Sequence, residues 1–229
     1  MVVLVLASLV WLATLAAGSA LGGSRAAGPK ILSLKLSGVV DPFMASYVKR
    51  GIDTATRAGD AAVLMTIDTP GGLDSSMRHI VQDILGSGVP VICYTGPSGA
   101  RAASAGTFIM LACPVSAMAP GTNIGAAHPV GVSGAVENEK VTNDAAAFIR
   151  SLADRWQRNA GWAEQAVRTA VSAAAEDALA MHVVDLNAPS TAALLNQVGS
   201  CQPGFQPSVA TGLLAESGSL PQVDRKSVV

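Results

Sequence analysis

This sequence has little of what builds nucleic-acid surfaces, metal centres or cross-linked frameworks. Only 4% of its 229 residues are aromatic, and the formal net charge is −1. Such a chain offers nucleic acids neither a positive field nor a stacking surface. Its three widely spaced cysteines predict no disulfide framework, and no paired Cys/Cys or Cys/His spacing predicts zinc. We therefore expect no nucleic-acid partner, no metal and no cofactor.

Apolar residues, in contrast, make up half of the chain. At this length they are sufficient for one substantial core, or for one core with a small appendage. Cys93 and Cys113 lie within apolar runs. Both are therefore interpreted as small core residues rather than as reactive thiols.

The first 21 residues form an almost continuous apolar run that is long enough to span a bilayer. Small residues at 16–20 suit signal-peptidase cleavage after Ala20, although a positively charged start is missing. A cleaved signal peptide and an uncleaved anchor both remain open, with a buried core helix as a third interpretation. Either of the first two places the rest of the chain outside the cytoplasm.

The chain divides into four parts by composition. Residues 1–21 are the signal peptide or membrane anchor, and 22–29 form a polar, glycine-containing linker. Residues 30–200 are the folded domain. Residues 201–229 are rich in Pro, Gly, Ser and Gln and form an irregular segment, beyond which we expect the natural protein to continue.

Apolar strands alternate with amphipathic helices through the folded domain. Strands are expected at 31–36, 61–67, 89–94, 115–119 and 182–186. Helices are expected at 42–58, 73–87, 107–113, 141–159, 162–170, 174–181 and 190–198, and a long loop at 122–140. The alternation predicts an α/β fold with a mostly parallel sheet.

Two glycine-rich turns each follow a predicted strand and precede a helix. The first is Asp68-Thr69-Pro70-Gly71-Gly72, and the second runs from Pro97 to Gly106 with Ser104 near its end. Exposed N–H groups at such turns suit an oxyanion or a phosphate, but no Gly-Lys-Ser/Thr follows to support a P-loop. Ser104 with the amide of Ala105 and those of the first turn forms a candidate nucleophile site. Tight helix-to-sheet packing without chemistry explains the same small residues, so both interpretations remain open.

A nucleophilic serine needs a base. His79 fits a solvated helix face, His128 a structural loop position before a proline, and His182 a packing role at the start of the last strand. Lys140, between the long loop and the next helix, is the more interesting candidate. A lysine acts as a base only where apolar surroundings keep its amine uncharged, so a solvated loop residue remains the alternative.

Three motifs in order closely resemble the NfeD family of membrane-bound serine proteases, which belong to the ClpP class and are related to signal peptide peptidase A. The motifs are DTPGG at 68–72, GARAASAGT at 99–107 and MAPGTNIGAAHP at 118–129. The resemblance covers roughly residues 30–200 and implies a ClpP/crotonase-like fold with a Ser–Lys dyad. Full-length members continue into a multi-span membrane region and a small OB-type β-barrel domain.

The resemblance also implies roles for individual residues. Ser104 is the nucleophile of the Ala-Ala-Ser-Ala-Gly motif, and Lys140, before Val-Thr-Asn, is the base. The oxyanion amides map to Gly72 and Ala105. The implied activity is endopeptidase cleavage of apolar segments of membrane-associated proteins, with stomatin-like partners. A homo-oligomer such as a dimer, attached to the membrane through the N-terminal segment on its extracytoplasmic side, is expected.

Two other functions remain open from the residues. The long loop before Lys140 leaves room for a non-catalytic module that binds membrane-protein tails on an inherited protease fold. A crotonase-type acyl-CoA enzyme would use the same paired amides, but the chain lacks a clear basic cluster for CoA.

Overall fold

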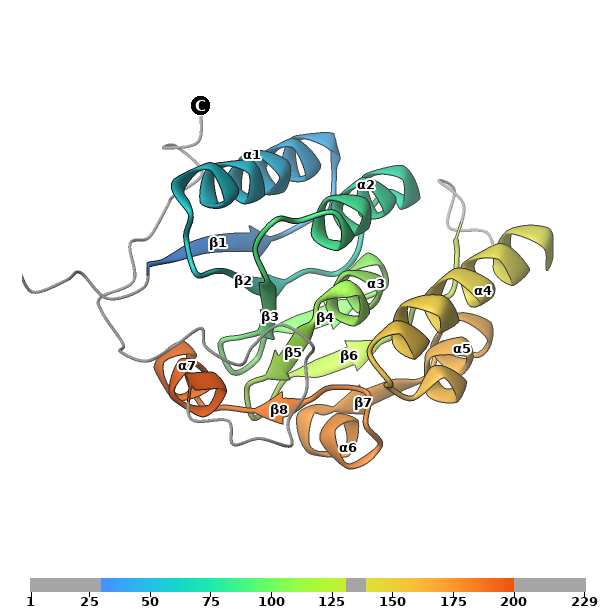
Figure 1. The fold of residues 1–229 in the computed structure, drawn as a ribbon. Coiled ribbons are helices and arrows are strands. Elements are labelled where there is room, and N and C mark those ends of the chain that lie inside the picture. Colours follow the sequence, from blue (N-terminus) through green and yellow to red (C-terminus); the bar gives the residue numbers. More distant parts are fainter. Residues whose placement is uncertain (1–29, 131–138, 200–229) are drawn as a thin grey trace, which may run out of the picture.

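A computed structural model describes residues 30–130 and 139–199 (Figure 1). The predicted segments 1–21, 22–29 and 201–229 lie outside the described residues, as does the middle of the predicted long loop. Within the two described ranges, none of the helices has the length and apolar character needed to cross a membrane.

Five parallel strands form the main sheet, in the order β1-β2-β3-β5-β8. They are β1 (Ile31–Ser37), β2 (Ala62–Asp68), β3 (Val91–Thr95), β5 (Val115–Met118) and β8 (Leu186–Asn187). β2 and β3 lie inside the sheet and are almost wholly buried, as their continuous apolar runs require. The predicted α/β fold with a mostly parallel sheet is confirmed.

Helices cover both faces of this sheet. The helices of the described residues are α1 (Pro42–Ala58), α2 (Asp74–Leu85), α3 (Ala105–Ala112), α4 (Glu139–Arg155), α5 (Ala160–Arg168), α6 (Ala175–Ala180) and α7 (Thr191–Gly199). One core joins α1, α2 and α3 to the sheet and extends to α4 and α5, and a smaller core packs α7 against the opposite face. In Figure 1, α4 and α5 lie side by side, far from α7.

α1 shows how local sequence sets the helix ends. The Asp41 side chain accepts a hydrogen bond from the N–H of Met44 at 2.7 Å, and Pro42 occupies the first turn. Gly59 ends the helix in the left-handed conformation, with φ of 66°. These are the start and stop signals on which the prediction rested.

A second, three-stranded sheet was not predicted. It consists of β4 (Arg101–Ala103), β6 (Asn123–Gly125) and β7 (Ser172–Ala174), with β4 parallel and β7 antiparallel to β6. β6 lies within the segment predicted as a long loop. A bridge between Thr69 and Ala102 joins the end of β2 to β4. This small sheet therefore sits beside both glycine-rich turns.

The predicted strand at 182–186 is mostly wrong, because only Leu186 of that range lies in a strand, β8. The N–H of His182 donates to Leu179 and that of Val183 to Ala178, which extends the end of α6. His182 has φ of 57° and is exposed, so the predicted packing role is also wrong.

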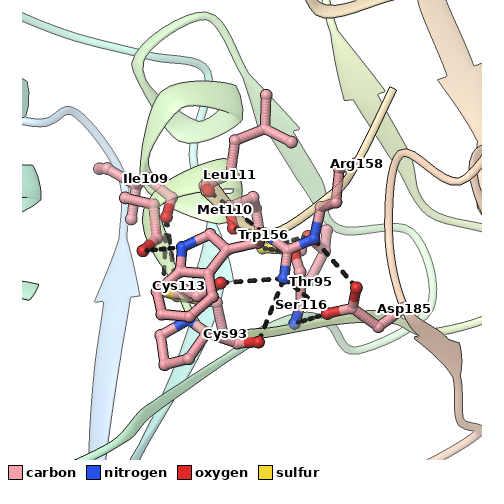
Figure 2. Close-up of a disulfide and its surroundings, with 12 residues drawn as sticks. Cys93, Thr95, Ile109, Met110, Leu111, Cys113, Ser116, Trp156, Arg158 and Asp185 are labelled. Carbon is pink, nitrogen blue, oxygen red and sulfur yellow. Dashed lines mark hydrogen bonds and ion pairs between the residues drawn. A yellow bond between two sulfur atoms is a disulfide. The ribbon is translucent and has the colours of Figure 1, made fainter. Parts of the chain in front are cut away.

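The cysteine prediction also needs correction. A disulfide joins Cys93 in β3 to Cys113 at the end of α3, two residues that are both fully buried (Figure 2). Both sulfur atoms lie near the carbonyl oxygen of Ile109. The predicted burial is right, but the pairing was missed because α3 brings Cys113 back beside β3, which a linear spacing of 20 residues does not reveal.

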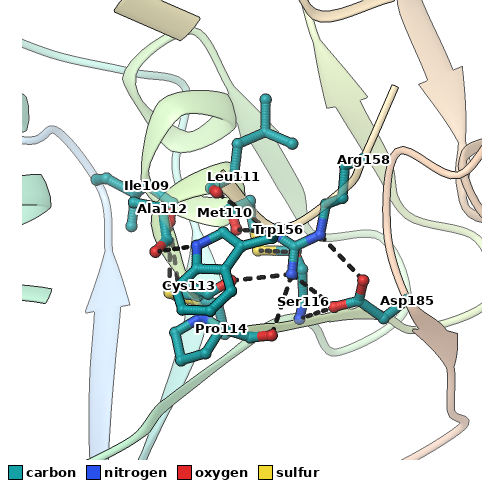
Figure 3. A network of polar contacts seen from close by, with 11 residues as sticks. Ile109, Met110, Leu111, Ala112, Cys113, Pro114, Ser116, Trp156, Arg158 and Asp185 are labelled. Atoms are coloured by element: carbon teal, nitrogen blue, oxygen red, sulfur yellow. Dashed lines mark hydrogen bonds and ion pairs between the residues drawn. A yellow bond between two sulfur atoms is a disulfide. The ribbon is translucent and has the colours of Figure 1, made fainter. Parts of the chain in front are cut away.

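A buried ion pair fixes the C-terminal end of α3 (Figure 3). Arg158, between α4 and α5, is only 6% exposed and lies 2.5 Å from Asp185. Its guanidinium donates to the carbonyl oxygens of Leu111 at 3.2 Å and Cys113 at 2.9 Å. Arg158 therefore caps the last turn of α3, where carbonyl groups lack helical partners.

Candidate active site

Ser104 stands in the turn between β4 and α3 in an unusual backbone conformation. Its φ is 52° and its ψ is −115°, a region that residues other than glycine rarely adopt. Its N–H donates to the carbonyl of Gly125 at 2.9 Å, and its own carbonyl accepts from the N–H of Thr107 at 2.9 Å. The Thr107 hydroxyl donates to Ala102 at 3.0 Å and accepts from the N–H of Gly125 at 3.1 Å. The strained turn is thus held by the small sheet.

Glycine is needed where the two glycine-rich turns meet. Gly71 has φ of 120°, and a Cβ placed there would lie 2.6 Å from the Cβ of Ser104. A Cβ at Gly106 would lie 2.7 Å from the Cγ2 of Thr69. The small residues therefore allow the close backbone approach that the sequence predicted.

Gly72 and Ala105 each present a backbone donor. The N–H of Val40 donates to Gly71, and the carbonyl of Val40 accepts from Leu73, both at 2.9 Å. In this parallel bridge the N–H and C=O of Gly72 itself face away from Val40. Ala105 opens α3, so its N–H belongs to the turn that lacks intrahelical acceptors.

One cleft, with a volume of about 650 Å³, is lined by all four predicted site residues. Its lining comprises Gly72, Asp74, Met77, Arg78, Ser104, Ala105, Phe108, Ala127, Pro129, Val130, Lys140, Val141, Asp144 and Ala145. The two glycine-rich turns, α3 and the start of α4 therefore meet here, although they are far apart in the sequence. The chemical roles of the four residues remain predictions.

Lys140 is the second residue of α4, which begins two residues earlier than predicted. Its side chain is exposed, so the dry surroundings expected for a base are not present in the single chain. The reason is local: burial of α4 begins only at Ala145, one turn later. The Lys140 side chain makes no hydrogen bond or ion pair with another residue of the described ranges.

The cleft is also lined by charged residues, Asp74, Arg78 and Asp144, that the sequence did not predict as part of the site. Arg78 of α2 donates from Nε to Asp74 at 2.9 Å and from Nη2 to Asp144 of α4. Its guanidinium lies 4.5 Å from the ring centroid of Phe148. The pair four residues apart on α2 is visible in the sequence, but the contact with Asp144, 66 positions away, has no local signal.

None of the three histidines lines the cleft. His79 is exposed on α2, as predicted. His128 has its Nδ1 2.7 Å from the carbonyl oxygen of Val167, which agrees with a structural role. Lys140 is therefore the one predicted base candidate that lines the same cleft as Ser104.

Ionisable groups with clear shifts lie away from the cleft. Burial raises the pKa of the Asp83 carboxyl, and Lys49 at 3.9 Å partly offsets this rise. Burial also raises the pKa of Tyr94, whose hydroxyl donates to Ala188 at 2.8 Å. In residues 30–130 and 139–199, no cluster of three or more His, Cys, Asp or Glu side chains is placed to hold a metal ion.

The family described as NfeD1b, N-terminal domain, matches residues 30–199. The chain belongs to the NfeD family. This NfeD domain is 38% identical over 168 residues to the membrane-bound protease PH1510 of Pyrococcus horikoshii, covering 71% of this chain and 38% of that protein. It is 35% identical over 101 residues to the membrane protein NfeD1b of Bacillus subtilis, covering 44% of this chain and 22% of that protein. The chain thus spans about two fifths or less of the length of these relatives.

Solved structures agree with this assignment. A serine-to-alanine mutant of the 1510-N membrane-bound stomatin-specific protease has a TM-score of 0.79 at 31% identity, covering 86% of this NfeD chain and 99% of that one. A lysine-to-alanine mutant in complex with a substrate peptide has a TM-score of 0.78, also at 31% identity, covering 86% and 93%. ClpP1 from Listeria monocytogenes, at 16% identity and a TM-score of 0.58, shares the fold. The predicted ClpP-like fold and NfeD resemblance are confirmed, and the domain is homologous to a membrane-bound protease.

Proposed function

We propose that this domain is a serine endopeptidase with a Ser104–Lys140 dyad. The observation that carries the proposal is that three separate segments bring Gly72, the adjacent residues Ser104 and Ala105, and Lys140 to one cleft. Structures of the related protease with one serine or one lysine replaced by alanine, the latter with a substrate peptide, support the choice of residue types.

In the proposed mechanism, uncharged Lys140 accepts the hydroxyl proton of Ser104 as its oxygen attacks the scissile carbonyl. The N–H groups of Gly72 and Ala105 stabilise the resulting oxyanion, each by roughly 3–4 kcal/mol in well-studied hydrolases. The protonated Lys140 then gives its proton to the departing amine. Lys140, uncharged again, then deprotonates a water molecule that attacks the acyl-enzyme. Its proton returns to the Ser104 oxygen as the second product leaves.

The substrate itself completes the site. Lys140 is exposed in the single chain, whereas much of the cleft wall is apolar, including Met77, Phe108 and Val141. An apolar peptide segment laid in the cleft would exclude water from the amine and favour its uncharged form. This supports apolar segments of membrane-associated proteins as substrates, and the stomatin specificity of the related protease makes stomatin-like tails the first choice.

The setting of this protease is also part of the proposal. We retain residues 30–200 as the protease domain and 1–21 as a signal peptide or anchor that places it on the extracytoplasmic side of a membrane, as a homo-oligomer such as a dimer. Relatives that are named membrane-bound proteins support the membrane association.

Replacing Ser104 by alanine tests the proposal. Cleavage of a fluorogenic apolar peptide should fall by about 10³-fold or more in kcat/KM, with an unchanged melting temperature. Ser98→Ala is the matched control, because Ser98 is an exposed serine of the same glycine-rich stretch and does not line the cleft. Full cleavage by Ser104→Ala would refute the proposal.

A non-catalytic module for binding membrane-protein tails is the second candidate, favoured by the exposure of Lys140. A serine-reactive phosphonate separates the two functions. Labelling of Ser104 that disappears in Lys140→Ala would exclude the binding module, because only an activated serine reacts in this way.

A further inference from the structure

We propose that Arg78 is a positioning residue of the dyad. By binding Asp144 it fixes helix α4 against α2 and prevents this carboxylate from pairing with Lys140. The inference rests on the proposed Ser104–Lys140 chemistry.

The first observation concerns one face of α4. Lys140, Asp144 and Phe148 are spaced four residues apart, so they lie on successive turns of the same helix face. A lysine and an aspartate at this spacing are natural ion-pair partners. Here Asp144 instead pairs with Arg78 of α2, although Asp144 and Lys140 both line the cleft.

The second observation is how Arg78 is held. Its Nε donates to Asp74 at 2.9 Å, its Nη2 donates to Asp144, and its guanidinium lies 4.5 Å from the Phe148 ring centroid. Phe148 stacks on Phe108 of α3 with ring centroids 5.8 Å apart. One planar side chain thus ties two turns of α4 to α2 and, through Phe148, to the helix that begins after Ser104. A lysine could supply the charge of Arg78 but not its fork of donors.

The charges around Lys140 show why this pairing matters. The cleft is lined by Asp74 and Arg78 from α2 and by Asp144 from α4, and Glu139 precedes Lys140 in the helix; α3 and residues 127–130 contribute only uncharged lining residues. A carboxylate beside an amine favours the ammonium form, which cannot accept a proton from Ser104. Arg78 pairs with two of these carboxylates, Asp74 and Asp144, and offsets one of their two negative charges. It therefore favours the uncharged amine that the mechanism needs.

The test is the pH dependence of kcat for peptide cleavage by the full chain. Arg78→Gln frees Asp144 to pair with Lys140, so the pH of half-maximal kcat should rise by about half a unit or more. Below that pH the rate should fall about threefold or more. The plateau rate should fall as well, because α4 loses its tether to α2.

Two further variants separate charge from tethering. Arg78→Gln combined with Asp144→Asn should return the half-maximal pH to the wild-type value while the plateau stays low. Arg78→Lys should keep the half-maximal pH and recover part of the plateau. Asp144→Asn alone removes a carboxylate near Lys140, so it should not raise the half-maximal pH. If Arg78→Gln does not fold, a rise in this single variant would contradict the inference.

Arg150→Gln is the matched control. Arg150 also ties α4 to a neighbouring helix, at 3.3 Å from Glu164 of α5, but it does not line the cleft. Its pH profile should match that of the wild type. The inference would be overturned by an unchanged half-maximal pH in Arg78→Gln, or by a rise that the added Asp144→Asn substitution does not reverse. In either case, cleavage that still depends on Ser104 would leave the proposed function standing. A wild-type chain without Ser104-dependent cleavage would overturn both.

Discussion

Replacing Arg158 by methionine tests the buried network at the end of α3. Methionine keeps much of the aliphatic stem of Arg158 but removes its guanidinium. The Arg158 side chain is only 2% exposed. Asp185 would retain the N–H of Ser116 at 2.7 Å, while the carbonyls of Leu111 and Cys113 would lose their donor. Removing one partner of a buried ion pair costs about 3–5 kcal/mol.

We expect the lower end of this range, about 3 kcal/mol, because the Asp185 side chain is 18% exposed and stays partly hydrated. In a domain of this size the loss corresponds to roughly 6–12 °C in melting temperature. Urea unfolding followed by circular dichroism measures the free energy directly. Arg158→Met combined with Asp185→Asn should recover at least about half of the loss, since no buried charge is then left unpaired.

Arg155→Met is the control for this measurement. Arg155 is exposed at the end of α4, with its guanidinium 5.2 Å from the Trp156 ring centroid, and its loss should cost no more than about 1 kcal/mol. Equal losses for Arg155→Met and Arg158→Met would refute the idea that the buried pair anchors α3.

Two further predictions concern backbone fit and pH. Gly71→Ala should abolish most peptide cleavage, because the new Cβ would lie 2.6 Å from the Cβ of Ser104. Gly59→Ala is the control, because Gly59 also has a positive φ but has open space around it. This control should lower the stability and leave kcat/KM unchanged. A carboxyl whose pKa is raised on folding, as burial does for Asp83, contributes stability at acidic pH that is lost as the pH rises through the raised pKa. Asp83→Asn should therefore be more stable than the wild type at pH 7, with the difference shrinking on acidification in urea titrations. A difference that does not change with pH would contradict this assignment.

Local sequence patterns were sufficient to predict four of the five strands of the main sheet and most helices. β2 is a continuous apolar run, and α1 carries its own start and stop signals at Asp41 and Gly59. β4 and β6 have three residues each, and they exist because they pair with each other across about 20 positions, which no local pattern records. Val183 is a β-branched residue of the kind common in strands, but its burial at the end of α6 determines its conformation instead.

The candidate site was predictable to a similar extent. Glycine-rich turns after parallel strands indicated Ser104, Ala105 and the amides of the first turn, and the need for a base indicated Lys140. The family resemblance then assigned individual roles to Gly72 and Lys140. The pairing of Arg78 with Asp144 could not be predicted, because a long side chain reaches between helices whose packing is known only from the fold. The same limit applies to the pairing of Cys93 with Cys113.

The bridge between Val40 and Gly72 has a practical consequence for anyone who trims this protein. A fragment that starts at α1 would keep α1 to α7 and the serine turn, yet it would lack the loop whose two hydrogen bonds orient the backbone around Gly72. Its failure to hydrolyse peptides would then say nothing about the dyad. Expression boundaries should therefore begin upstream of β1, since the loop after the first strand holds Gly72 of the proposed site in place.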